Sequence, residues 1–408
     1  MKKYLSIILI LSITLLITGC KSQKEINNNS STSNNSDSFQ LESSLTDNNA
    51  NVENSNSDET TSEESSQNIE SNNDVSSPSS IISTPSQSNP SQDSDSGIPS
   101  FKPTLNYNFL PKDADRIYNS EAGGVTGNLE LYKKMVNAYL NYETSVPFDS
   151  STQTPHFVLN MLRFHCPVFF SDTSIDVDFA DYSTGKVIIT YTSKSKSEHN
   201  KIIEDFENAC KPYISGLESA SQTQKALICY YRYIQTLDYD YNLANFEVEN
   251  FHLYDRNNPR YDEGYNALVK NTGVCSSFSI AYSFLLSQLN IDSYTIFAVG
   301  TDNAHAWNML KLNGKWYFAD PTFDADWPQG DNSITNFGIT TKQRISLGYY
   351  PENYNISNLP NNFSDYSVND LRFEALTKGA FNPEFNINNK TMIYKDLNEK
   401  NQPQFDLS

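Results

Sequence analysis

Cysteine and histidine are scarce in this chain, which has five of each among 408 residues. So few cysteines cannot build a disulfide-dense scaffold, and no C-x-x-C pair indicates a structural zinc site. Basic residues are outnumbered, with 29 Lys and Arg against 49 Asp and Glu, and the formal net charge is -20. Because no basic stripe is available to neutralise phosphates, nucleic acid is not an expected partner.

Motifs for bound cofactors are absent as well. The sequence has no Gly-rich phosphate loop, no zinc-binding helix motif and no nucleophile-elbow serine. Asp320, Asp324 and Asp326 suggest a calcium loop as one alternative, but their spacing does not match an EF-hand and its glycine is missing. We therefore expect the chemistry of this protein to need neither a metal nor a cofactor.

The first twenty residues have the pattern of an export signal. Lys2 and Lys3 precede an apolar run over residues 5–17, which suits a signal-peptide core and is short for a membrane-spanning helix. The run ends in Ile-Thr-Gly followed by Cys20, which resembles the lipobox of bacterial lipoprotein precursors. The resemblance implies a signal peptide over residues 1–19, lipid on Cys20, and anchoring to the outer face of the bacterial cell membrane. The alternative is an ordinary secretory signal in which Cys20 has no role.

Residues 20–104 are expected to form a disordered tether. Residues 21–100 contain 25 Ser and 14 Asn, and their single aromatic residue is Phe39. They also hold 13 acidic and 2 basic residues. Without apolar periodicity, burial cannot offset the entropy of ordering such a segment. A flexible chain of this length reaches on the order of 50 Å, which suits a domain held away from a membrane.

The aromatic residues mark the folded part, since 49 of the 51 lie in residues 101–408. Residues 105–215 are predicted to form a small α+β domain without visible chemistry. Apolar spacing predicts three helices, over residues 128–142, 156–165 and 197–215, and a hairpin of strands over residues 175–180 and 186–192 that turns at residues 183–185. Three histidines there, His156, His165 and His199, share no ligand spacing and are expected to be surface or core residues.

Residues 216–408 are predicted to form the second folded domain. Ser221 and Gln224 fit a capping box that begins a helix, and a tyrosine-rich loop over residues 239–265 follows it. The next elements are a helix over residues 275–289 and three strands over residues 293–300, 304–312 and 315–320. Residues 340–408 contain no motif and are expected to pack against this core.

Cys275 stands at the start of the predicted helix, directly after Gly273 and Val274. A thiolate in that position faces unpaired backbone N–H groups and the positive end of the helix dipole, and both favour the anion. A thiol that ionises readily is a nucleophile. Taken alone, however, a cysteine on a helix is more often a small buried hydrophobic residue.

His305 and Asp320 are related by the register of the predicted hairpin. Asn313 and Gly314 are the strongest short hairpin signal. With a two-residue turn there, the residue numbers of the two partners in each strand pair add up to about 627. Asp320 then lies opposite residue 307, and because side chains alternate along a strand, His305 shares that face. A slip of one residue would place them on opposite faces. The spacing therefore predicts an imidazole–carboxylate contact.

Four motifs in this order resemble the bacterial transglutaminase-like core of the papain-like superfamily: Gly-Val-Cys at 273–275, Asn-Ala-His-Ala-Trp-Asn at 303–308, Gly-Lys-Trp-Tyr at 314–317 and Asp-Pro-Thr-Phe-Asp at 320–324. The resemblance covers about residues 220–330. It implies an α+β fold in which an N-terminal helix carrying Cys275 packs on an antiparallel sheet. It also implies that Cys275, His305 and Asp320 are the nucleophile, the base and the orienting acid.

One departure from that family is Ser277, because many members have glycine two residues after the cysteine. The implied activity is acyl transfer from amide bonds of proteins or cell-wall peptides, resolved either by an amine, as in cross-linking, or by water, as in a peptidase. The alternative is a non-catalytic binding module displayed on the cell surface. Since the chain is expected to be exported, Cys166, Cys210 and Cys229 could also supply one disulfide, of undetermined pairing.

Overall fold

The structure is a computed structural model, and all its described residues belong to one compact unit. They are residues 109–110, 114–118, 126–180, 184–246, 258, 260–301, 303–325, 333–355, 367–396 and 402–408. The predicted signal peptide (residues 1–19), Cys20, the predicted tether (residues 20–104) and Asp326 lie outside the described residues. The domain boundary placed at residue 215 stays a prediction.

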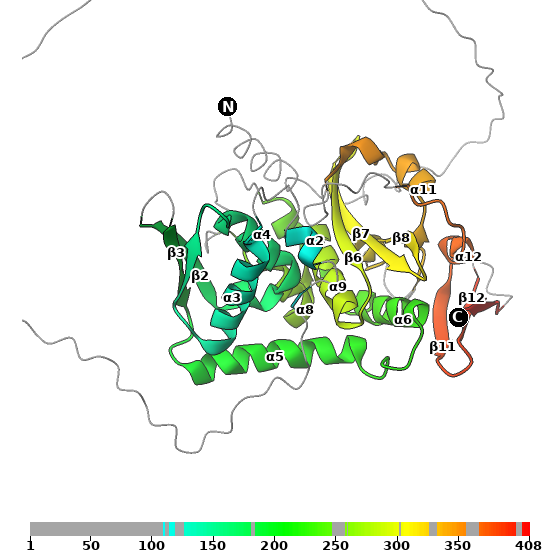
Figure 1. The fold of residues 1–408 in the computed structure, drawn as a ribbon. Helices are drawn as coiled ribbons and strands as arrows, with labels where there is room; N and C mark the ends of the chain where they lie inside the picture. Colours follow the sequence, from blue (N-terminus) through cyan, green and yellow to red (C-terminus); the bar gives the residue numbers. More distant parts are fainter. Residues whose placement is uncertain are drawn as a thin grey trace, which may run out of the picture. The chain divides into compact units, whose positions relative to one another are not determined.

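The N-terminal block combines helices with a small sheet (Figure 1). The sheet is antiparallel with the strand order β1-β3-β2, formed by β1 (Ser145–Asp149), β2 (Thr173–Phe179) and β3 (Thr184–Tyr191). The helices are α2 (Ala114–Tyr118), α3 (Asn128–Asn141), α4 (Pro155–His165), the short 3-10 helix η2 (Pro167–Ser171) and α5 (Lys196–Ile214). The three helices and the hairpin predicted in this block are confirmed.

The turn predicted at residues 183–185 overlaps β3, which begins at Thr184. Thr184 and Gly185 belong to β3, where they pair with Asp149 and Phe148. A Cβ atom on Gly185 would lie 2.4 Å from the Asp178 carbonyl oxygen and 2.5 Å from the Phe148 ring. Gly185 therefore allows the strands to pack closely, although glycine in the sequence suggested a turn.

The core is a five-stranded antiparallel sheet with one helix packed on it (Figure 1). The strand order is β10-β6-β7-β8-β9, with β6 (Ser293–Val299), β7 (Ala304–Leu312), β8 (Lys315–Ala319), β9 (Phe337–Ile339) and β10 (Tyr354–Asn355). Helix α9 (Cys275–Gln288) packs against β6 and β7 and is covered on other sides by α4, α6 (Gln222–Ile234) and α8 (Glu263–Val269). This is the predicted α+β class, with the cysteine-bearing helix on an antiparallel sheet.

Burial on several sides explains the composition of α9. Every residue from Cys275 to Leu286 is buried, so the helix has apolar or small residues around its whole circumference rather than one apolar stripe. Its polar side chains are small and bonded locally: Ser279, for example, donates to the Cys275 carbonyl oxygen at 2.8 Å. The helix that carries the candidate nucleophile is thus held from all directions.

The hairpin of β7 and β8 has the predicted register. Asn313 and Gly314 both have positive φ angles, 50° and 84°, as a two-residue turn of this type requires. Leu312 pairs with Lys315, and Asn308 pairs with Ala319. The strand pairing ends there, because the Asp320 N–H donates to the Asn336 carbonyl oxygen at 2.9 Å.

The tyrosine-rich segment differs from the predicted loop. The short helix α7 (Tyr241–Ala244) forms within it, because the Asp240 side chain accepts the Leu243 N–H at 2.9 Å, and α8 also begins there. Strand β4 (Asp238–Tyr239) pairs in parallel with β5 (Thr272–Gly273). The capping box of α6 is confirmed, since Ser221 and Gln224 exchange hydrogen bonds of 3.0 and 3.2 Å.

The C-terminal segment packs against the core as expected. Phe373 is buried against Phe337 and Tyr317, and the Ser221 hydroxyl donates to the Leu407 carbonyl oxygen at 2.6 Å. The remaining elements are α10 (Pro321–Ala325), α11 (Thr341–Ser346), the short 3-10 helix η4 (Pro351–Asn353), α12 (Glu374–Thr377), β11 (Phe381–Asn386), β12 (Thr391–Lys395) and β13 (Gln404–Asp406). Among the helices of the described ranges, none has the length and apolar character needed to cross a membrane.

Candidate functional site

His305 and Asp320 form the hydrogen-bonded pair that the hairpin register predicts. His305 is the second residue of β7, and Asp320 directly follows β8. The His305 Nε2 atom lies 2.7 Å from Asp320 Oδ2. His305 is 5% exposed and Asp320 is fully buried. The pair therefore joins an imidazole to a carboxylate in a place from which water is largely excluded.

Asp320 is held from three sides. Its Oδ1 accepts the backbone N–H groups of Thr322 (3.1 Å) and Phe323 (3.3 Å), which open α10. Its Oδ2 is shared by His305 and by Arg344, whose Nη2 donates at 2.8 Å. Burial by itself would raise the pKa of Asp320, but the charges of His305 and Arg344 outweigh it and lower the pKa to about 2. The carboxyl group is therefore ionised throughout the ordinary pH range.

Arg344 is a site residue that sequence reasoning missed. It lies in α11, 24 residues beyond Asp320, in a segment without a motif. It is fully buried, and its guanidinium carbon lies 4.5 Å from the centre of the Trp307 ring. A single arginine outside any motif carries no sequence signal, so only the tertiary structure reveals its contact with the carboxylate.

Aromatic rings fix the plane of the His305 imidazole. The Phe323 ring is stacked on it with a centroid distance of 4.5 Å and an interplanar angle of 10°. Trp307 and Tyr349 lie farther away, with centroid distances of 6.0 and 5.6 Å. The Tyr349 hydroxyl donates to Asn303 Oδ1 at 2.6 Å. The residues around the histidine thus restrict its rotation while one edge stays bonded to Asp320.

Cys275 is the first residue of α9, as predicted, and is 6% exposed. Helix α9 packs against β7, which carries His305, and against α10, which follows Asp320. Cys166, Cys210 and Cys229 are buried, and the disulfide considered among them is not formed.

A buried carboxylate fixes the first turn of α9. Glu263 accepts hydrogen bonds from the hydroxyls of Ser276 (2.6 Å) and Ser277 (3.3 Å), and its other oxygen accepts from Arg163 Nη2 at 2.7 Å. Arg163 lies in α4 of the N-terminal block. The sequence did not predict this network, because its members are 13 to 100 residues apart.

Ser277, which stands where many relatives have glycine, is accommodated by another glycine. A Cβ atom on Gly273 would lie 2.5 Å from the Ser277 Cβ, so the absent side chain at 273 makes room. The Ser277 hydroxyl accepts the Val274 N–H at 3.1 Å. The serine therefore caps the helix that begins at Cys275.

Asp324 anchors the chain beyond α10. It accepts hydrogen bonds from the Tyr230 hydroxyl (2.6 Å) and from backbone and side-chain donors of Thr335 and Asn336. Burial raises the pKa of Asp324 despite these donors. Its oxygens are thus used within the chain, and the described part of the chain contains no group of three or more His, Cys, Asp or Glu residues arranged to hold a metal ion.

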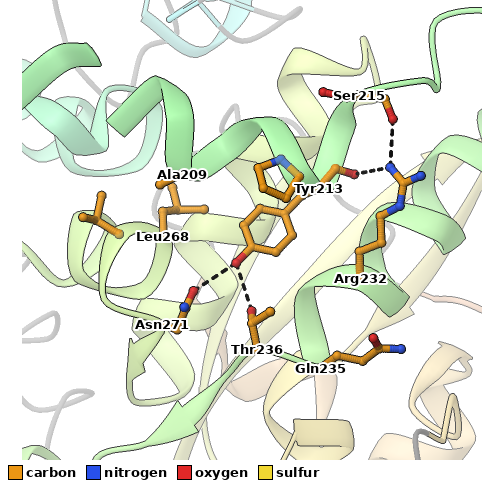
Figure 2. A pocket seen from close by; sticks show the side chains of 10 residues that line it. Ala209, Tyr213, Ser215, Arg232, Gln235, Thr236, Leu268 and Asn271 are labelled. Carbon is orange, nitrogen blue, oxygen red and sulfur yellow. Dashed lines mark hydrogen bonds between the residues drawn. The ribbon is translucent and has the colours of Figure 1, made fainter. Parts of the chain in front are cut away.

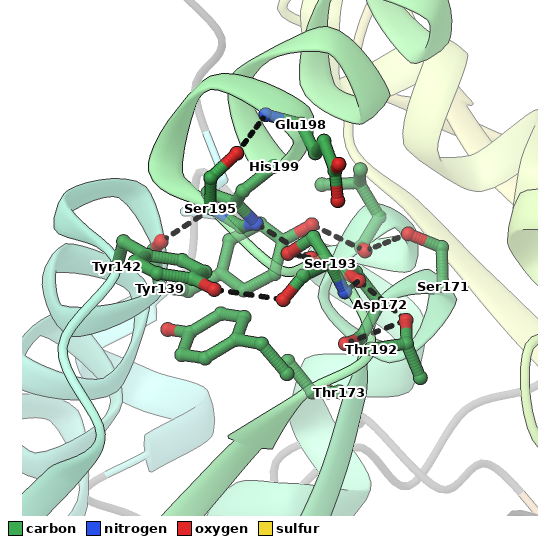
Figure 3. A network of polar contacts seen from close by, with 12 residues as sticks. Tyr139, Tyr142, Ser171, Asp172, Thr173, Thr192, Ser193, Ser195, Glu198 and His199 are labelled. Atoms are coloured by element: carbon green, nitrogen blue, oxygen red, sulfur yellow. Dashed lines mark hydrogen bonds and ion pairs between the residues drawn. The ribbon is translucent and has the colours of Figure 1, made fainter.

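A second histidine–aspartate pair lies in the N-terminal block (Figure 3). His199 and Asp172 are both fully buried, with Nδ1 of the histidine 2.9 Å from Asp172 Oδ2. The other ring nitrogen, Nε2, lies 2.7 Å from the Tyr139 carbonyl oxygen. Both edges of this imidazole therefore contact oxygen acceptors, and His199 is the core histidine that was expected. His156 is exposed, whereas burial lowers the pKa of His165 to about 3, so that His165 stays neutral.

A pocket in the described part of the chain is lined by neither His199 nor His305 (Figure 2). It has a volume of about 560 Å³ and is lined by the C-terminal ends of α5, α6 and α8. Tyr213 lies at its centre, and its hydroxyl donates to Asn271 Oδ1 at 2.9 Å and lies 2.9 Å from Thr236 Oγ1. Arg232 at its edge donates to two backbone carbonyl groups, at 3.3 and 3.0 Å. None of the three candidate catalytic residues lines it.

Comparison with known proteins finds a family model that matches part of the chain. Residues 213–321 match the family model of the transglutaminase-like superfamily, and this segment is therefore a transglutaminase-like domain. It contains all three candidate catalytic residues, Cys275, His305 and Asp320. Arg163 and Arg344 lie outside it, on either side.

Solved structures that match part of this chain include two proteins. One is a TGase, 18% identical with a TM-score of 0.25, where the match covers 38% of this chain and 45% of that chain. The other is a candidate cysteine protease from Cytophaga hutchinsonii, 11% identical with a TM-score of 0.21, covering 37% of this chain and 62% of that one. The chain thus spans less than two thirds of the length of either structure. A comparison with curated proteins found no match.

Proposed function

We propose that the protein is a cysteine acyltransferase or hydrolase that acts on amide bonds through Cys275, His305 and Asp320. The observation that carries the proposal is the buried His305–Asp320 pair, which follows the register of β7 and β8 inside the segment matching the transglutaminase-like superfamily. The three residues supply the functions that thiol-based acyl transfer needs: a nucleophile, a proton acceptor and a group that orients it.

The reaction uses two steps. The Cys275 thiol loses its proton to His305, and the sulfur attacks the carbonyl carbon of the amide to form a tetrahedral oxyanion. Collapse of this intermediate breaks the C–N bond, His305 returns the proton to the leaving amine, and a thioester remains on Cys275. An amine or water then attacks the thioester while His305 accepts its proton. The C–S bond breaks, the acyl group leaves on the new nucleophile, and His305 returns the proton to the Cys275 sulfur. Because Nε2 of His305 is bonded to Asp320, the ring nitrogen that exchanges protons with sulfur is Nδ1.

The oxyanion needs hydrogen-bond donors, and two groups near the start of α9 are suited to the role. One is the backbone N–H of Cys275, in the first turn of the helix. The other is the hydroxyl of Tyr239, because the parallel pairing of β4 with β5 sets Tyr239 beside Gly273, two residues before the cysteine. The Tyr239 ring also packs against Phe278, one turn along α9, with a centroid distance of 6.2 Å.

Replacement of Tyr239 by phenylalanine tests this donor. We expect turnover to fall about 100-fold, because one oxyanion donor is lost, while alkylation of the Cys275 thiol, which forms no oxyanion, keeps its rate. An equal loss in both reactions would show that the tyrosine acts on the thiol instead.

We propose further that the enzyme acts at the outer face of a bacterial cell membrane, anchored by lipid on Cys20. The support is the sequence alone: a charged start, an apolar run and an Ile-Thr-Gly-Cys end. Two or more acyl chains, at about 0.8 kcal/mol per buried methylene group, would hold the protein firmly on a bilayer. Proteins and cell-wall peptides are the amide substrates within reach of a surface enzyme on such a tether.

Thiol labelling tests the catalytic proposal. The full chain is reduced and treated with iodoacetamide, and alkylation is followed at Cys275 and, as internal controls, at the buried Cys166 and Cys229. We expect Cys275 to react much faster, because burial raises the pKa of the two control thiols. Hydrolysis of p-nitrophenyl acetate with a burst of one acyl group per chain should disappear in Cys275→Ala. A chain whose Cys275 reacts no faster than an ordinary thiol and shows no burst would instead be a binding module.

A further inference from the structure

We propose that Arg344 is a positioning residue of this site, which keeps Asp320 in place and charged so that the carboxylate can orient His305. The inference rests on the proposed function, since it concerns how the catalytic histidine is held. Arg344 lies outside residues 213–321, so the transglutaminase-like segment is completed by a side chain from the C-terminal part of the chain.

Within the described part of the chain, the acidic partner of Arg344 is Asp320. Its Nη2 donates to Asp320 Oδ2 at 2.8 Å, the same oxygen that His305 Nε2 contacts at 2.7 Å. The guanidinium and the carboxylate are both fully buried. Nε and Nη1 of Arg344 are buried and have no hydrogen-bond partner among the described residues. Such a costly placement is stable only because the opposite charge lies beside it, and removal of either partner would leave a buried charge uncompensated.

Two aromatic rings hold the guanidinium at this position. The Arg344 Cζ atom lies 4.5 Å from the centre of the Trp307 ring and 5.6 Å from that of Phe323. Phe323 is also the ring stacked on His305 at 4.5 Å. The same aromatic residue therefore packs against the cation and the imidazole, while Asp320 bonds to both. A lysine, with its compact ammonium group, could supply the charge but not the flat surface for stacking.

The charge of Arg344 has a defined effect on the pH dependence of the site. Its removal takes a positive charge from the buried cluster, which raises the pKa of Asp320 toward and above its ordinary value. Below that pKa the carboxyl group is neutral and no longer stabilises the imidazolium, which in turn stabilises the thiolate. The acidic limb of Cys275 reactivity should therefore move to higher pH.

Other ionisable groups also face this cluster. The Tyr230 hydroxyl of α6 donates to the Asp320 carbonyl oxygen at 2.8 Å, and Asp324 of α10 accepts from the same hydroxyl. Burial raises the pKa of both groups, so over the neutral range Tyr230 carries no charge. Tyr354 of β10 lies within electrostatic range of Arg344, and burial raises its pKa to about 12. Arg344 supplies the positive charge that faces Asp320 in this set.

The experiment measures the rate of Cys275 alkylation by iodoacetamide against pH in the reduced full chain. In Arg344→Met, we expect the acidic limb to move up by about one pH unit, which is about a tenfold slower reaction at a fixed pH on that limb. Arg344→Lys should keep the limb close to its original position, because the charge is retained. Arg232→Met is the matched control: it removes an arginine that bonds only to two backbone carbonyl groups at the Figure 2 pocket, and its limb should not move.

A folded Arg344→Met protein with an unmoved limb, or an equal shift in Arg344→Lys, would overturn the inference. If Arg344→Met does not fold, the pair Asp320→Asn and Asp320→Asn/Arg344→Met decides, because the double variant has neither buried charge. We expect the two to have the same profile, since Arg344 acts through Asp320; an added shift in the double variant overturns the idea. An unreactive Cys275 in the unaltered chain would contradict the proposed function and this inference together, whereas a reactive one that ignores Arg344 contradicts this inference alone.

Discussion

The molecule contains two buried histidine–aspartate pairs with different surroundings. In the N-terminal block, His199 contacts Asp172 through Nδ1 and the Tyr139 carbonyl oxygen through Nε2. In the core, His305 contacts Asp320 through Nε2, and that carboxylate is shared with Arg344. Distances and burial are nearly the same in the two pairs. The pairs differ in what holds each carboxylate, and His199 has oxygen atoms at both of its ring nitrogens.

That difference separates a structural pair from a candidate catalytic one. A histidine with backbone oxygen at one nitrogen and carboxylate at the other has no ring nitrogen left for substrate chemistry. His199 connects α5 to α3 and to Asp172, which directly precedes β2. Asp172 also accepts hydrogen bonds from Thr192 and Ser193, which directly follow β3 (Figure 3). His305 lies at the start of a strand against the cysteine-bearing helix instead. A buried imidazole–carboxylate contact is therefore no sign of catalysis until its second edge is known.

The largest expected difference between the pairs is in chemistry. His305→Gln should lower the rate of p-nitrophenyl acetate hydrolysis by about 1,000-fold, because proton transfer by a positioned histidine contributes that order of rate. His199→Gln should leave the rate per folded molecule unchanged. Burst kinetics with active-site counting would show it, and a comparable loss in both variants would remove the distinction.

The second difference is in stability. Asp172→Asn should destabilise the chain by about 3 kcal/mol, because it leaves the buried His199 without its counter-charge and weakens the bonds to Ser193. Urea unfolding followed by circular dichroism measures this change. Asp172→Glu, which keeps the charge, serves as the control and should lose less; an Asn variant as stable as the parent would show that the pair is not an ion pair.

Both Asp172 and Asp320 should contribute to the pH dependence of the unfolding free energy. Hydrogen bonds from Ser193, Thr192 and His199 lower the pKa of Asp172 against the effect of burial, and the pKa of Asp320 is lowered to about 2. A carboxyl group whose pKa is lowered in the folded state stabilises the fold at every pH above its pKa in the unfolded state, which is about 3.9. This contribution is lost as the pH falls through the pKa of the folded state. For Asp320, the unfolding free energy should fall by about 2 kcal/mol between these two pKa values. Unfolding free energies that stay constant as the pH falls below about 4 would contradict it.

The smallest effects distinguish the tyrosines beside each histidine. Tyr142→Phe removes a hydrogen bond to the Ser193 carbonyl oxygen (2.8 Å), and Tyr349→Phe removes one to Asn303 (2.6 Å). Each should cost about 1 kcal/mol of unfolding free energy in urea titrations. Only Tyr349→Phe should also slow turnover, because its ring lies 5.6 Å from that of His305. A turnover effect of Tyr142→Phe would link the two pairs.

Local signals in the sequence were sufficient for much of the core. The Asn313–Gly314 turn admits one register, so the pairing of β7 with β8 and the contact of His305 with Asp320 could be worked out before any coordinates. The start of α9 at Cys275 followed from the apolar run behind Gly273 and Val274. The segment at 239–265 was wrong as a plain loop, because the Asp240 cap of α7 is a short signal within a tyrosine-rich stretch.

The sequence by itself determined the elements, the hairpin register and three candidate catalytic positions, because helix starts, two-residue turns and strand alternation depend on neighbours a few residues apart. The tertiary structure alone decided that Arg344 supports Asp320, that Glu263 joins Arg163 to the first turn of α9, and that His199 is enclosed on both edges. These contacts join residues 13 to 100 positions apart. Packing of the helices and sheet selects such partners by shape and charge, and no periodic pattern in the chain records that choice.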